Sequence, residues 1–99
     1  MSESKNDAIA VRHNVAEHRF EAEVDGLLSV AEYERRGGEI VFTHTVVPPA
    51  LRGRGIAEKL VRRALAYARD EGLRVVPACS YVAAFVRRHP EFRPLVGKT

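Results

Sequence analysis

The sequence has a single cysteine, no signal-peptide pattern and no apolar run long enough to cross a membrane. One cysteine cannot form a disulfide within the chain, so the cysteine content does not call for an oxidising compartment. Hydrophobic residues make up 45% of the chain and charged residues of both signs 29%, as in an ordinary soluble globular protein. We therefore expect a cytoplasmic protein with no membrane partner.

Aromatic residues are also few, at 7%, and no recognised nucleic-acid-binding motif occurs. The net charge of +3 favours anionic partners only weakly, because arginine and lysine are spread along the chain. Proteins that bind nucleic acid without sequence preference usually show a concentrated basic face or stripe. A small basic nucleic-acid-binding domain is therefore the least favoured of the functions that the sequence allows.

The 99 residues are enough for one domain with a modest core. We expect a single domain over 1–99, with the polar segment 1–7 disordered at its start. Apolar and polar residues alternate in the first half, and Asp25-Gly26 is a strong two-residue hairpin signal. This pattern predicts an antiparallel meander with strands at about 9–15, 19–24, 27–34 and 40–47.

The second half predicts a strand-helix-strand unit. Apolar residues recur at helical spacing over about 55–71, and Gly72 supplies a stop. Pro77 places the next strand, over 73–78, at an edge, and Ser80 is a candidate N-cap for a last helix ending before Pro90. The expected fold class is α+β: a mixed, mostly antiparallel sheet of about five strands with two main helices.

The segment 46–57 joins the fourth strand to the first of these helices and carries two glycines and two arginines. The first N–H groups of a helix have no partner inside it and carry partial positive charge, which makes this loop a candidate anion site. It is not a P-loop, because no Gly-Lys-Ser/Thr follows, and it lacks the third glycine of a dinucleotide fingerprint. A plain tight turn with solvated arginines is the alternative interpretation.

Arg52-x-x-Gly55-x-Ala57 matches the signature of the GNAT superfamily of N-acetyltransferases, which has Arg or Gln, two residues, Gly, one residue, and then Gly or Ala. The wider run 42–60, together with the blocks 75–79 and 87–92, resembles the small single-domain branch of that superfamily, sometimes called YjdJ-like. The three blocks follow in order on the expected elements, which makes the resemblance more specific than the short signature alone.

The resemblance implies a sheet whose fourth and fifth strands splay apart to receive acetyl-CoA or CoA. The pantetheine arm would then contact Val46 and Val47 on the earlier strand. The pyrophosphate would lie on main-chain N–H groups of the loop and helix start, which comprise Arg52, Gly53, Arg54, Gly55, Ile56 and Ala57. No metal site is expected.

Two residues are candidates for catalysis. Cys79 lies where the fifth strand gives way to the last helix, and helix N-termini lower thiol pKa values, although single cysteines are often only small buried hydrophobes. His44 lies on the fourth strand and could take a proton from an attacking amine, or could serve a structural role. Strict alternation places His44 on the face of Phe42 and Val46, opposite Thr43 and Thr45.

The sequence departs from the family in two ways. Many GNAT enzymes carry a tyrosine on the last helix that protonates the leaving CoA thiolate, but alignment by Phe92 places Val86 there and leaves Tyr81 a full turn earlier, as a packing residue. Larger members also place two helices between their first two strands, and these are missing here. The acceptor side should then be open.

These points lead to a first hypothesis, an acetyl-CoA-dependent N-acetyltransferase acting on an exposed amine such as a protein lysine or a polyamine. Transfer would be direct or would pass through acetyl-Cys79. A CoA- or acyl-CoA-binding module without catalysis is the second hypothesis. The chain is expected to be a monomer or a weak dimer.

Overall fold

The structure is a computed structural model that describes residues 9–97. The segment 1–7, expected to be disordered, lies outside these residues. The described chain folds into a sheet, two α-helices and two short 3-10 helices. In chain order the elements are β1 (Arg12–Asn14), β2 (Arg19–Val24), β3 (Leu27–Arg36), β4 (Glu39–Val46), η1 (Pro49–Leu51), α1 (Ile56–Asp70), β5 (Arg74–Pro77), α2 (Ser80–Arg88) and η2 (Pro90–Leu95).

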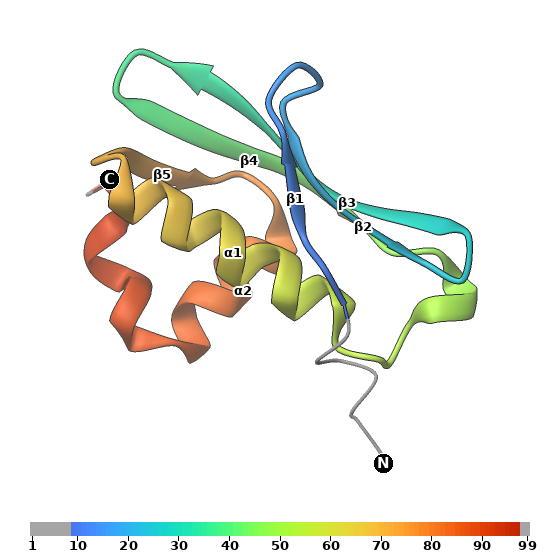
Figure 1. Ribbon diagram of the computed structural model, residues 1–99. Coiled ribbons are helices and arrows are strands. Elements are labelled where there is room, and N and C mark those ends of the chain that lie inside the picture. The colour runs from blue at the N-terminus through green and yellow to red at the C-terminus, as the bar shows by residue number, and fades with distance from the viewer. Residues whose placement is uncertain (1–8, 98–99) are drawn as a thin grey trace.

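The strands form one mixed sheet in the order β1-β2-β3-β4-β5 (Figure 1). Neighbours from β1 to β4 are antiparallel, and β5 runs parallel to β4 after the crossover through α1. The predicted fold class, a mostly antiparallel α+β sheet with two main helices, is confirmed. Only the turn 15–18 separates β1 from β2, so the helices that larger family members carry there are missing, as expected.

The hairpin between β2 and β3 turns at the dipeptide that the sequence singled out. Asp25 and Gly26 both have positive φ, at 54° and 77°. Two consecutive residues of this kind give the tight turn whose twist matches that of the flanking strands. The turn brings Val24 opposite Leu27 and fixes the register of both strands.

Both helices pack on the same face of the sheet, so the opposite face has no helix over it among the described residues (Figure 1). The apolar stripe of α1 meets the inward side chains of β2, β3 and β4, and α2 and η2 close the core beside β5. No helix of the described chain is both long and apolar enough to span a membrane. The largest fully buried side chains include Phe20, Phe42, Phe85, Ile40, Leu51, Ile56, Leu60 and Leu65.

Several element boundaries differ from the predictions. The first strand comprises only Arg12–Asn14, because the chain turns at Val15, whose side chain is exposed. The N-cap of α2 is Cys79 and not Ser80, since Ser80 already has helical hydrogen bonding. In the tail that follows α2, Phe92 is buried in the core and Pro94 is exposed.

A β-bulge in β4 overturns the predicted orientation of His44. Phe42 pairs with Tyr33, but His44 pairs with the preceding residue, Glu32, so Thr43 is the extra residue of the bulge. An extra residue shifts the alternation of every side chain after it. His44 therefore lies on the helix-free face, opposite to Phe42, and the prediction that they share a face is wrong.

A buried carboxylate ties β1 to β2 on this helix-free face. Glu21 is only 3% exposed and receives hydrogen bonds from Arg12 (2.7 Å), Asn14 (2.8 Å) and Arg19 (2.6 Å). The hydrogen bonds from Arg19 and Asn14, with that from Arg12, outweigh burial and lower the pKa of the Glu21 carboxyl from its ordinary 4.5. Three donors around one buried charge thus hold the short edge strand in place.

We expect Glu21→Gln to lower the free energy of unfolding by about 1–3 kcal/mol at pH 7, because it weakens charged hydrogen bonds to a buried group. Glu23→Gln, an exposed change on the same strand, is the control and should stay within about 0.5 kcal/mol. Denaturant titration measures both.

The pH dependence gives an independent check of the Glu21 result. A carboxyl whose folded pKa is depressed stabilises the fold above its unfolded pKa, and that stabilisation is lost as pH falls through the folded value. The gap between wild type and Glu21→Gln should therefore narrow below about pH 4.3. A gap that is equal at pH 3 and pH 7 would contradict this account.

Candidate active site

The sheet forks between β4 and β5. The two strands pair from Glu39 with Arg74 to Phe42 with Pro77, and the backbone N–H of Cys79 then donates to the Phe42 carbonyl at 2.8 Å. Beyond that bond, residues 44–46 pair with β3 on one side, and no described strand pairs with the other edge of β4. The fork therefore leaves peptide groups of β4 available to a ligand.

The loop that follows β4 presents free amides at the start of α1. Gly53 and Gly55 have φ of 83° and 79°, a left-handed conformation that glycine adopts at little cost. The first helical bond of α1 runs from the Lys59 N–H to the Gly55 carbonyl. Within the described chain, the N–H groups of residues 53–58 donate to no backbone carbonyl. The Arg52 N–H does, since it bonds to Pro49 at 3.3 Å.

Both arginines of the loop have partners within the protein. The Arg52 Nε donates to the Val47 carbonyl at 3.1 Å, and the Arg54 guanidinium contacts the Asp25 carboxylate at 3.0 Å. Arg54 thereby connects the loop to the hairpin between β2 and β3. The charge of Arg52 stays beside the free amides, whereas that of Arg54 is partly neutralised by Asp25.

A hollow of about 240 Å³ lies beside these amides. Most of the residues that the sequence assigned to the cofactor line this hollow. Arg54 does not line it, and neither does Val46, which is 51% exposed at the end of β4. Tyr81, expected to serve packing alone, also lines it. The full lining is Val47, Leu51, Arg52, Gly53, Gly55, Ile56, Ala57, Glu58 and Tyr81.

Three residues of this lining, Leu51, Glu58 and Tyr81, were not predicted as site residues, and the last two are polar. Glu58 lies in the first turn of α1, and burial together with the Glu58 charge raises the pKa of the Tyr81 hydroxyl. Tyr81 therefore stays protonated and can donate a hydrogen bond. Its place one residue after the start of α2 is the only sequence signal that could have indicated it.

Cys79 lies at the branch point of the fork, on the helix-covered face. Its thiol is 3.5 Å from the Thr45 hydroxyl, a contact that the bulge in β4 makes possible by turning Thr45 inward. Burial raises the pKa of the Cys79 thiol, but polar contacts from Thr45 and from backbone groups of Val82 and Tyr81 outweigh it, so the pKa is lowered.

His44 lies at the same level of the fork but on the other face. Its side chain is 70% exposed, and its Nδ1 is 3.5 Å from the Glu32 carboxylate. The structure therefore brings Cys79 and Thr45 together and leaves His44 across the strand from them. The two predicted catalytic residues flank the fork from opposite sides and do not form a pair.

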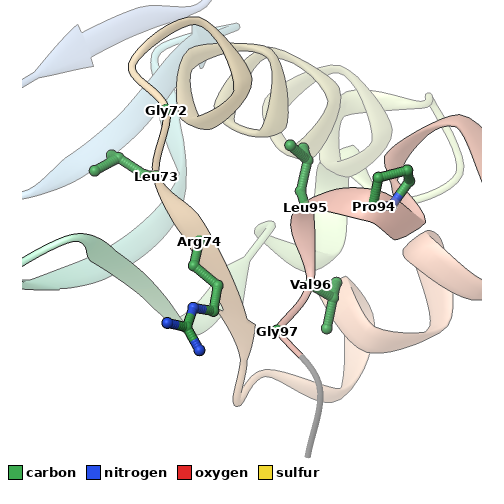
Figure 2. A pocket seen from close by; sticks show the side chains of 7 residues that line it. All are labelled: Gly72, Leu73, Arg74, Pro94, Leu95, Val96 and Gly97. Carbon is green, nitrogen blue, oxygen red and sulfur yellow. The ribbon is translucent and has the colours of Figure 1, made fainter.

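A larger hollow, of about 590 Å³, lies at the other end of β5 (Figure 2). It separates Gly72, Leu73 and Arg74 from the C-terminal segment 94–97, which joins the edge of β5 through a bridge between Val75 and Val96. Arg74 is the only ionisable side chain of its lining and contacts Glu39 at 3.8 Å. It offers no nucleophile. Within residues 9–97, no cluster of three or more potential metal ligands occurs.

The arrangement is shared by a solved structure. A Staphylococcus aureus protein, determined by NMR and described as a GCN5-like candidate N-acetyltransferase, superimposes with a TM-score of 0.72 over 91% of this chain and 89% of its own. Its sequence identity is 22%, so this likeness concerns the fold.

Sequence comparison identifies relatives in vertebrates. Protein NATD1 of Bos taurus is 39% identical over 85 residues, which cover 83% of this chain and 75% of that protein, and Protein NATD1 of Homo sapiens is 36% identical over the same shares. The family model described as GCN5-related N-acetyl-transferase matches residues 19–95, from β2 to the end of η2. The forked sheet, the glycine loop and these matches agree: the chain belongs to the GCN5-related N-acetyltransferase family.

Proposed function

We propose that this family member is an acetyl-CoA-dependent N-acetyltransferase that acts on an exposed amine, such as a protein lysine or a polyamine. The observation that carries the proposal is the juxtaposition at the fork: free amides at the start of α1, an unpaired edge of β4 and the Cys79 thiol lie along one path. In acetyl-CoA, the diphosphate would match the free amides, the amide-bearing pantetheine arm would match the unpaired edge of β4, and the thioester would match the position of the thiol.

Binding would use both the loop and the strand. The N–H groups of residues 53–58 would hold the pyrophosphate, where the helix dipole favours negative charge. The pantetheine arm would pair with the free edge of β4 near Val46 and Val47 as an added strand. The Arg52 Nε donates a hydrogen bond to the Val47 carbonyl in this structure. When the cofactor binds, the guanidinium would leave this carbonyl and bind the pyrophosphate, which is charged and therefore a stronger partner.

Two routes of transfer fit the geometry. In the covalent route, the Cys79 thiolate attacks the thioester carbon, CoA leaves as a thiolate, and an amine then takes the acetyl group from Cys79. In the direct route, a neutral amine attacks the thioester, and backbone N–H groups of β4 stabilise the oxyanion. The lowered pKa of Cys79 and its contact with Thr45 favour the covalent route.

A charge placed on the anion loop tests the binding site. We expect Ala57→Glu to weaken acetyl-CoA binding at least about tenfold in calorimetry, because it puts a carboxylate among the free amides of the first turn. An acidic residue is favourable at a helix start, so the fold should be retained. Ala66→Glu, on the same helix and also half-buried, is the matched control and should bind like wild type. Equal affinities for the two variants would place the pyrophosphate elsewhere.

Incubation with acetyl-CoA alone tests the covalent route. We expect the mass of the intact protein to rise by one acetyl group that maps to Cys79, and Cys79→Ser to remain unmodified, because a hydroxyl is a far weaker nucleophile at neutral pH. If wild type turns over an amine without ever carrying the acetyl group, transfer is direct. If it binds acetyl-CoA and turns over no amine, the chain is a CoA-binding module.

A further inference from the structure

The fork is accessible from the face of the sheet that carries no helix. On the opposite face, Leu51, Ile56 and Tyr81 close around the hollow beside the loop. On the helix-free face, the exposed side chains of His44 and Val46 lie beside the fork. They pair with Glu32 and Val30 on the neighbouring strand β3. A thioester lying along β4 would thus be covered on one face and reachable on the other.

The carboxylate nearest the fork on this face, Glu32, differs from those that contact arginine. Glu21, Glu34 and Glu39 each contact arginine, at 2.6 to 3.8 Å. Among the described residues, Glu32 has one charged contact, with His44 at 3.5 Å, and its side chain is 42% exposed. Arg19 lies directly opposite Glu32 on β2, but its Nε donates its hydrogen bond to Glu21. Glu32 therefore has no arginine in ion-pair contact, although the charge of Arg19 attracts it across the strand, and its carboxylate faces solvent beside the fork.

The contact between Glu32 and His44 also places one ring nitrogen nearest the carboxylate. With Nδ1 turned toward the carboxylate, Nε2 is directed away from Glu32 and is free to accept a proton. An exposed ion pair of this kind adds little to stability, so a stabilising role does not account for it. A carboxylate that fixes the tautomer of a histidine is a recurring arrangement around a general base.

We propose that the helix-free face beside the fork is the acceptor side, where Glu32 attracts a cationic amine and holds His44 as the base that takes the proton of that amine. This inference rests on the proposed function and adds a substrate class, an amine with further positive charge close by. Long-range attraction to one exposed carboxylate would favour such an acceptor over a singly charged one.

The step balances without a further reactant. The acceptor loses one proton to solvent, and the neutral amine attacks the acetyl carbon from the helix-free face. A C–N bond forms, the C–S bond breaks, and the surplus proton on nitrogen passes to His44 Nε2. While His44 carries this proton, Glu32 stabilises its imidazolium. The proton then passes from His44 to the departing CoA thiolate, so the products are free CoA and a neutral His44. In the covalent route, the same base serves the attack on acetyl-Cys79, and the proton passes to the Cys79 thiolate.

The test compares Glu32→Gln with Glu34→Gln, a change on the same strand and face whose glutamate contacts Arg36. The acceptors are 1,5-diaminopentane, a peptide with two adjacent lysines, and 1-aminopentane as the singly charged probe. We expect Glu32→Gln to lower kcat/KM for the two polycationic acceptors about tenfold or more, with a rise in KM that 1-aminopentane does not show. Glu34→Gln should stay within about twofold of wild type. Acetyl-CoA affinity should be unchanged in both variants.

The possible failures are distinguishable. If wild type binds no acetyl-CoA, the proposed function fails. If wild type acetylates amines and the two variants behave alike, or 1-aminopentane is affected as strongly in KM, the acceptor side is wrong while the proposed function stands. If wild type acetylates 1-aminopentane but neither of the polycationic acceptors, the inferred substrate class is wrong while the proposed function stands.

Discussion

One backbone hydrogen bond decides where the site lies. The N–H of Cys79 donates to the Phe42 carbonyl at 2.8 Å and is the last link between β5 and β4. Had the strands continued to pair, the edge of β4 over 43–46 would be covered, and no arm of a ligand could join it. Because the chain leaves the sheet at this bond to start α2, the same residue that ends the pairing places its thiol at the opening.

The fold was largely readable from the sequence because its signals are local. Period-two alternation, the Asp25-Gly26 turn and the apolar stripe of α1 each act within a few residues. The structure has each strand and each α-helix within a few residues of its prediction, whereas the two 3-10 helices were not predicted. The loop residues were also readable, because two glycines with positive φ between a strand and a helix leave a recognisable pattern. Family resemblance then supplied a ligand for that loop, which composition alone does not.

The faces on which the two candidate catalytic residues lie could not be read in the same way. The bulge at Thr43 inserts one residue into β4, and no local pattern in the segment 40–46 indicates it, since both registers bury Phe42. Its effect is large, because it turns Thr45 toward Cys79 and His44 toward solvent. The partners of Arg52 and Arg54 were unreadable for a different reason: Asp25 is 29 residues away in the sequence and meets Arg54 only once the sheet has formed.

The contact between Arg54 and Asp25 has a consequence for how the loop keeps its shape. Holding several amides of a loop toward one point costs conformational entropy. A contact from outside the loop that already restricts it reduces the entropy that is lost when a ligand binds. Here the contact comes from the tip of a hairpin that has no chemistry of its own. If the loop binds the cofactor as proposed, lengthening that hairpin or removing its acidic tip would change cofactor affinity through the rigidity of the loop. The outermost turn of the sheet is in this sense part of the candidate binding site.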